Sequence, residues 1–475
     1  MTTMIRNRLR VAFAAALCTG AAAGCVDLKG TGLDTDPNQP SSSTRNPLFA
    51  ATQAFQQVAM TGDVNRFPII WMQQMAGVNR QWLAFERYEI DENTQGYDQF
   101  YGVGSGGLVD LRNIQAQSRV LNDKVYLGIA QTYEALIMGY VVDGWGNVPY
   151  TQAVNFNTFP TPKLDSADVV YASLQVLLDS ALANLATGIG SGPGGADLVY
   201  GGNAAKWIAM AHTLKARLYL HTAEVVGAAA YANAATQAAL GIASAGGSYN
   251  TYNSTTTGEE NQWFMFRRNR GTDIAAGKFL VDVMIARADP RISNYFALQG
   301  GVYKGANPGD EDDGTFSWLS GTRAGGGFNQ PLVTYDENAH ILAEAQTSLR
   351  GGAGDVAALA TLNAYRATVG LAALPAFGTP TLLLQEILLS KYIALFQNYE
   401  VWNDYKRTCY PNLAPNATAL APTNKIPVRY YYGSSERQTN PNIPSVSQQS
   451  LPINRRTKMD PVNASTVGGG ACLGN

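Results

Sequence analysis

Repeated helical spacing of apolar residues is the feature of this sequence that most limits its fold. Residues 123–142 place Ile129, Tyr133 and Ile137 four positions apart, which predicts a single apolar helix face. Several other segments have the same spacing. The predicted helices span residues 47–61, 108–121, 123–142, 166–185, 203–226, 231–243, 273–288, 335–349, 355–369 and 382–406. We therefore expect a mainly α-helical protein.

Several of these helices are neighbours joined by short links. Residues 335–349 and 355–369 form the clearest pair, and residues 166–185 with 203–226 form another. Paired helices rich in Ala and Tyr predict stacked hairpins of the tetratricopeptide kind, because Ala allows close approach and Tyr fills the remaining space. Long irregular loops rich in Gly, Asn, Ser and Thr separate the pairs, at residues 76–107, 186–202, 244–271 and 297–330. Little β structure is expected, limited to short segments such as 426–432.

The N-terminus has the pattern of a bacterial secretion signal. Arginines precede a short apolar run at residues 11–17, and small residues continue to Gly24. Ala22-Ala-Gly-Cys25 resembles a lipobox, which implies a lipidated Cys25; ordinary cleavage nearby is the alternative. We expect residues 1–24 to be a lipoprotein signal peptide, 25–45 a polar tether and 46–475 a single helical domain. No later stretch reaches about 20 apolar residues, so no further membrane span is expected.

The remaining cysteines suggest a disulfide and no metal site. Once the signal peptide and Cys25 are set aside, Cys409 and Cys472 remain. An oxidising compartment would permit a bond between them, although two separate thiols are equally consistent with the sequence. The sequence has no CxxC motif and no Cys/His cluster, so we expect no zinc. The acidic run 310–313 lacks the spacing of a calcium loop and is interpreted as a solvated turn.

Composition and motifs argue against nucleic-acid binding, nucleotide cofactors and catalysis. Charged residues make up 15% of the chain and the net charge is -2, so the basic surface that nucleic acid requires is not expected. Residues 102–107 and 190–195 match GxGxxG, but no strand-like segment precedes either one. The three histidines occur in no known catalytic pattern. We expect no cofactor and no enzyme activity, although two carboxylates brought together by folding could still act on a glycoside.

Five motifs in order resemble the SusD/RagB family of outer-membrane lipoproteins, and in particular its SusD-like branch. They are DGWGNVPY at 143–150 with Ala153, DPRI at 289–292, the segment 335–345, the segment 386–411 and the segment 426–440. Together with the N-terminal part they cover residues 34 to about 445. Their charged residues can pair locally at helix spacing, so we interpret the motif residues as scaffold and not as a ligand site.

The resemblance implies a SusD-like fold and a function in nutrient uptake. Members are cell-surface lipoproteins that bind an oligosaccharide, or sometimes a peptide, and deliver it to a SusC-like TonB-dependent transporter in the outer membrane. They are not enzymes. The alternative from another class is an envelope interaction scaffold of helical repeats without a small ligand, and a hydrolase is a distant third.

Aromatic residues in the long loops are the candidate ligand contacts. Sugar rings present C–H faces that pack on aromatic rings, and hydroxyl groups that need polar partners. The candidates are Trp82, Trp318, Tyr97, Asn79, Arg80 and Trp263. The segment around Trp263 is common in the family, so this residue could instead be scaffold. The other tryptophans lie in or beside predicted helices and are expected in the core.

Overall fold

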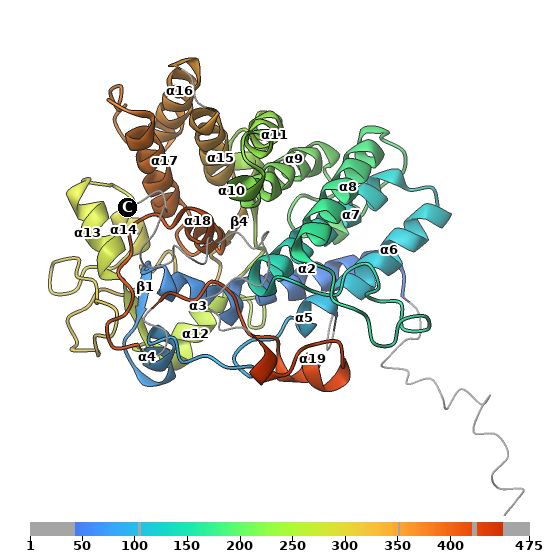
Figure 1. Ribbon diagram of the computed structural model, residues 1–475, viewed down its shortest axis with the longest axis horizontal. Helices are drawn as coiled ribbons and strands as arrows, with labels where there is room; N and C mark the ends of the chain where they lie inside the picture. The colour runs from blue at the N-terminus through green and yellow to red at the C-terminus, as the bar shows by residue number, and fades with distance from the viewer. Residues whose placement is uncertain (1–42, 103–105, 350–351, 420–424, 450–475) are drawn as a thin grey trace, which may run out of the picture. The chain divides into compact units, whose positions relative to one another are not determined.

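Helices dominate the described part of the chain, as the apolar spacing predicts (Figure 1). The computed structural model describes residues 43–102, 106–349, 352–419 and 425–449, with only the backbone of residues 352–354. The described elements belong to one unit that begins at Arg45. The longer helices are α2 (Arg45–Thr61), α3 (Asp63–Trp71), α6 (Leu108–Val120), α7 (Lys124–Trp145), α8 (Ala167–Ala186), α9 (Ala204–His221), α11 (Ala228–Ala238), α12 (Gln262–Arg270), α13 (Lys278–Ala286), α15 (Tyr335–Ser348), α16 (Gly352–Thr368), α17 (Pro380–Ala394) and α18 (Glu400–Thr408). Shorter helices are α4 (Arg80–Glu86), α5 (Asp98–Tyr101), α10 (Ala223–Val226), α14 (Ile292–Tyr295) and α19 (Ser434–Thr439).

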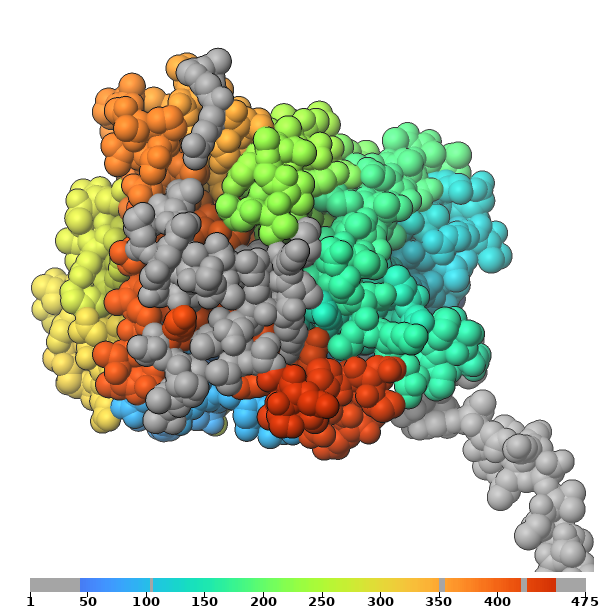
Figure 2. Space-filling model, viewed as in Figure 1, coloured from blue at the N-terminus to red at the C-terminus, as the bar shows by residue number. Residues whose placement is uncertain are grey.

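Successive helices pack as hairpins. Contacts run from α6 to α7, α8 and α9, then through α11 to α15, which also packs on α16 and α17. The predicted pairs α8 with α9 and α15 with α16 are both confirmed. In Figures 1 and 2 the helices α6 to α8 lie on one side of the view, and α13 with the loops that follow it lies on the other.

Helix α7 is the most deeply buried element. Every residue from Val125 to Trp145 is buried. A Cβ atom at Gly128 would lie 2.7 Å from the Ala181 carbonyl oxygen, so glycine permits the close approach of α8. By length and composition α7 and α8 could each cross a membrane, but core helices pass the same test, and the apolar stretch of α7 lies wholly inside the protein.

The β structure consists of short ribbons, as expected. Strand β1 (Met75–Gly77) pairs antiparallel with β3 (Ile274–Ala276), and β2 (Tyr249–Asn250) pairs antiparallel with β4 (Pro331–Val333). In the first ribbon Ala76 lies opposite Ala275. The ribbon therefore brings the segment before α4 next to the segment before α13.

Several local predictions are wrong. The predicted helix 203–226 divides into α9 and α10, and the predicted loops 76–107 and 244–271 contain the helices α4, α5 and α12. The segment 273–288 begins as β3 before α13 starts, because its backbone pairs with β1. The predicted helix 382–406 is interrupted between α17 and α18 at Gln397, which has a left-handed φ of 63°. Residues 426–432 form no strand. Their backbone bonds to helix ends and side chains instead, as when Tyr430 N–H donates to the Gly144 carbonyl at 2.8 Å.

Candidate functional site

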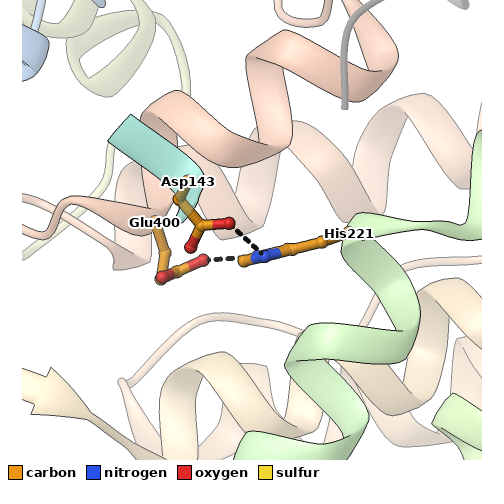
Figure 3. Close-up of side chains that lie close together, drawn as sticks. All are labelled: Asp143, His221 and Glu400. Carbon is orange, nitrogen blue, oxygen red and sulfur yellow. Dashed lines mark hydrogen bonds and ion pairs between the residues drawn. The ribbon is translucent and has the colours of Figure 1, made fainter. Parts of the chain in front are cut away.

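A buried histidine connects three helices. His221 ends α9 and places Nδ1 3.0 Å from Asp143 Oδ1 and Nε2 2.8 Å from Glu400 Oε2. Asp143 lies near the end of α7, and Glu400 is the first residue of α18. Figure 3 shows the imidazole ring held by the two carboxylates. Each of these side chains is at most 3% exposed, so a substrate cannot reach the ring in this conformation.

Further polar groups complete this cluster. Arg217, one turn earlier on α9, forms ion pairs with Glu337 at 2.6 Å and with Glu400 at 3.3 Å. Asn403 donates its side-chain amide to Asp143 and to Glu400, at 3.1 Å each. Buried charges need partners of opposite sign and hydrogen bonds to offset the loss of hydration. The arrangement supplies both, and so it fits a structural role.

The trio fits an ion-pair cluster better than a metal site. One ligand atom from each of Asp143, His221 and Glu400 lies within 4.8 Å of the others. Burial alone would lower the pKa of His221, but the charges and hydrogen bonds of the two acids raise it to about 9. Burial would raise the pKa of Glu400, but Arg217 and His221 hold it well below its usual range. A protonated imidazole has no lone pair for a metal ion.

The stability of the fold is expected to fall as the pH rises from 6.5 to 9. His221 has a pKa of about 9 in the folded protein and about 6.5 in the unfolded chain. Its stabilisation is complete below pH 6.5 and is lost towards pH 9, by up to about 3 kcal/mol. Burial lowers the pKa of His340 to about 3. Protonation of this residue therefore changes the stability of the fold only below about pH 6.5, outside the range considered for His221. Urea unfolding at a series of pH values measures the effect. If the free energy of unfolding fell as steeply between pH 6.5 and 9 in His221→Gln as in the wild type, His221 would not be its cause.

A second buried cluster links α15, α17 and α18. Both arms of the Arg407 guanidinium contact the Glu344 carboxylate, with Nη2 2.7 Å from Oε2. The same Nη2 lies 2.7 Å from Asp404, and Lys391 lies 2.8 Å from that carboxylate. These four residues lie in the motif segments 335–345 and 386–411, as Asp143 and Glu400 lie in motif segments, whereas Arg217 and His221 come from α9, outside the motifs. The prediction that motif residues are scaffold fits their complete burial.

Three of the predicted ligand-binding rings lie in the interior. Trp82 is 1% exposed and packs on Phe67 and Phe266, with ring centroids 5.4 and 5.1 Å away. Trp263 is 0% exposed and Tyr97 is 3% exposed. A sugar needs an accessible ring face, so the structure corrects the ligand-binding role expected for these three residues. Trp82 lies on α4 and Trp263 on α12, short helices within the predicted loops. The ring of Trp82 packs against α3 and that of Tyr97 against α7, which the position of these residues in the sequence does not indicate.

The other three candidates gather beside the β1–β3 ribbon. Trp318 is partly buried and packs against an apolar cluster that contains Val78 and Ala275. Asn79 follows Val78 and accepts the backbone N–H of Arg80 at 2.9 Å, at the start of α4. Arg80 is exposed. In Figure 2 the blue atoms of the α4 region meet the yellow atoms of the segment after β3. Residues far apart in sequence therefore share this surface.

A surface pocket of about 490 Å³ adjoins the same apolar cluster. Tyr303, Asn307 and Asp310 line it, together with Phe316, which belongs to the cluster that supports Trp318. Lys304 lies 5.0 Å above the Phe316 ring. Aromatic surface with amide, carboxylate and ammonium groups can bind a polyhydroxylated ligand. None of these pocket residues is among the predicted ligand contacts, although they fall in the predicted long loop 297–330.

The remaining predictions lie partly outside the described residues. Cys25 and Cys472 fall there, while Cys409 is disulfide-bonded. The Cys409–Cys472 pairing and the lipidation of Cys25 stay predictions. The acidic run forms the expected turn, in which Asp312 and Asp313 accept backbone N–H groups at 2.9 Å. These carboxylates therefore already have partners within their own turn.

Comparisons with known proteins agree with this architecture. The sequence matches the profile of the SusD-like family described as "Starch-binding associating with outer membrane" over residues 37–433. Comparison with curated proteins gives no match. A SusD/RagB family protein from Bacteroides thetaiotaomicron is 22% identical, with a TM-score of 0.66 over 85% of this chain and 95% of its own. A chitin-binding SusD homologue from Flavobacterium johnsoniae is 20% identical, with a TM-score of 0.71 over 84% and 94%. At these identities the structures establish a shared fold.

Proposed function

The chain belongs to the SusD-like family, and on that premise we propose that it binds an oligosaccharide at the bacterial cell surface. It passes this ligand to a SusC-like TonB-dependent transporter of the outer membrane. Carbohydrate binding is the property common to the family, and one structural relative is named as chitin-binding. Lipid on Cys25 would anchor the protein, with residues 25–45 as the tether. Catalysis is not part of the proposal, because the one buried histidine–carboxylate cluster described above is closed to substrate.

One observation carries the proposal for this chain: a partly exposed tryptophan stands beside a polar pocket. Trp318 packs on the cluster that also contains the pocket residue Phe316. A sugar ring on the indole would place its hydroxyl groups within reach of polar groups in this region. Peptide remains the alternative ligand, and an interaction scaffold without a small ligand remains the alternative function.

Calorimetry of the purified protein against a panel of polysaccharides and peptides tests the proposal directly. Binding of at least one glycan supports it. Binding of peptides alone would favour the alternative ligand. Binding of neither, also with the transporter present, would favour the scaffold.

Replacing Trp318 by alanine is expected to weaken glycan binding about five- to tenfold, because a ring contact of this kind contributes about 1 kcal/mol. Affinity electrophoresis or calorimetry measures the change. Phe156→Ala is the control, since Phe156 is 69% exposed and lies outside the pocket and the cluster around Trp318. Equal affinities for Trp318→Ala and the wild type would contradict the placement of the site. Loss of uptake by Trp318→Ala with the transporter complex intact would argue against the scaffold.

A further inference from the structure

One buried carboxylate holds two partly exposed arginines at the end of the β1–β3 ribbon. Asp273 Oδ1 lies 3.0 Å from Arg80 Nη1, and Asp273 Oδ2 lies 3.6 Å from Arg270 Nη1. The Asp273 side chain is 0% exposed, whereas those of Arg80 and Arg270 are 55% and 42% exposed. Two guanidinium groups and one carboxylate leave one positive charge that is not neutralised within the trio.

Arg270 differs in this respect from its neighbours on α12. Arg268 has its own acid, Glu260, at 3.2 Å. Arg267 donates to a backbone carbonyl at 3.0 Å. Arg270 instead shares Asp273, at an ion-pair distance too long for a hydrogen bond. The trio therefore orients two guanidinium groups while leaving N–H donors of Arg270 available to a ligand.

The backbone of Arg80 is also unusual. Its φ of 50° lies in the left-handed region, which residues other than glycine seldom occupy. Glycine would adopt this conformation without steric cost. Strained backbone of this kind clusters at functional sites, and at Arg80 it carries a large, exposed, charged side chain. Its ion pair with the fully buried Asp273 fixes where the guanidinium lies.

The arginine pair and Trp318 belong to the same face of the ribbon. Val78 N–H donates to the Asp273 carbonyl at 2.9 Å, so these two residues lie opposite each other at the end of the register. Alternate residues of a strand share a face, which places Asp273 with Ala275. Val78 and Ala275 both belong to the cluster on which Trp318 packs. An aromatic ring and a cationic pair thus occupy neighbouring parts of one surface.

We propose that Arg80 and Arg270 bind the carboxylate of a uronic-acid unit, so that the preferred ligand is an anionic glycan. The inference rests on the proposed glycan-binding function and adds the charge class of the ligand. A guanidinium fork matches a planar carboxylate through paired N–H···O bonds. A sugar ring of the same glycan packs on Trp318 through its C–H face.

Acidic residues near the surface would repel an anionic glycan, so the preference for a charged ligand depends on the two arginines. Asp312 N–H donates to the Val78 carbonyl at 3.0 Å, and Glu311 lies 3.9 Å from Arg87. These carboxylates bring negative charge close to the surface and oppose an anionic ligand. Loss of either arginine should therefore remove the preference for charged glycans instead of only weakening it.

Polygalacturonate and its fully methyl-esterified form provide the test, because they share one sugar and differ in charge. Calorimetry at physiological salt is expected to show at least tenfold tighter binding of polygalacturonate by the wild type. Arg80→Gly and Arg270→Gln should each weaken that binding at least tenfold and weaken binding of the methyl ester far less, because the ester has no negative charge to lose a partner. Arg80→Gly relieves the left-handed strain but leaves the buried Asp273 carboxylate with Arg270 alone, so the melting temperature of each variant is measured and binding is compared among variants that remain folded. Arg268→Gln, on the same helix, is the matched control and should change affinity less than twofold.

Other outcomes overturn the inference. Equal binding of the charged and esterified polymers, or an equal loss in Arg268→Gln, would refute it and leave the proposed glycan-binding function standing. Binding of poly-L-glutamate as tight as that of polygalacturonate would show that the pair recognises acidic peptide. If no glycan binds, charged or neutral, both the inference and the proposed function fail.

Discussion

Replacing His221 by glutamine is expected to lower the free energy of unfolding by about 3 kcal/mol. The imidazolium lies between Asp143 and Glu400, at 3.0 and 2.8 Å, in a region closed to water. Glutamine can replace a hydrogen bond but not the positive charge. Asp143 would then lose its ion pair, and Glu400 would be left with Arg217, which already pairs with Glu337 at 2.6 Å. Urea denaturation at pH 6, where the histidine is charged in the folded state, measures the loss.

His212→Gln is the control for this variant. His212 lies on the same helix, α9, but is only partly buried, and its Nδ1 contacts the neutral side chain of Gln237 at 2.7 Å. We expect it to change stability by less than about 0.5 kcal/mol, as for an ordinary surface substitution. A loss in His221→Gln no larger than in His212→Gln would show that the buried cluster contributes little to the fold.

Replacing Arg407 by methionine is expected to cost about 3–5 kcal/mol of unfolding free energy. The guanidinium is 0% exposed and contacts both oxygens of Glu344 as well as Asp404. Burial lowers the pKa of Arg407, but these acids raise it well above its ordinary value, so the group stays charged throughout the accessible pH range. Methionine fills much of the volume but leaves Glu344 with only Lys391, 3.9 Å away. Chemical denaturation measures the change.

A matched ion pair at the surface provides the comparison for Arg407. Arg437 also contacts both oxygens of a glutamate, Glu92, at 2.7 and 2.8 Å, but its side chain is 29% exposed. Because water solvates a carboxylate left alone at the surface, Arg437→Met should lose far less stability than Arg407→Met. Similar losses in both variants would mean that burial does not set the cost of removing the arginine.

The predicted helices succeeded where local spacing decided the structure. Residues 335–349 and 355–369 correspond closely to α15 and α16, since each segment has an apolar face and the link between them is short. The break between α17 and α18 was not foreseen. There the Gln397 carbonyl accepts buried side-chain amides from Asn65 and Gln330, at 2.8 and 2.7 Å. Because partners more than 60 residues away stabilise this turn, a local sequence pattern does not predict it.

The predicted ligand contacts likewise fall into two groups, those at the surface and those in the interior. Loop position selected Trp318, Asn79 and Arg80, which lie beside the β1–β3 ribbon, but it also selected Trp82, Trp263 and Tyr97, which are buried. Asp273 is the first residue of a predicted helix and is not among the predicted ligand contacts. Its carboxylate nevertheless orients Arg80, which lies 193 positions away in sequence. Whether a loop ring faces water or the core depends on which element the loop covers.

Sequence by itself determined the helical class, most helix positions and the family, because these follow from spacing and motifs within short stretches of chain. Only the tertiary structure decided that Asp143, His221 and Glu400 meet, and which aromatic rings remain accessible. The contacts of His221 with Asp143 and Glu400 join residues 78 and 179 positions apart. Such contacts form when helices pack to bury their apolar faces, and one sequence read locally does not specify them.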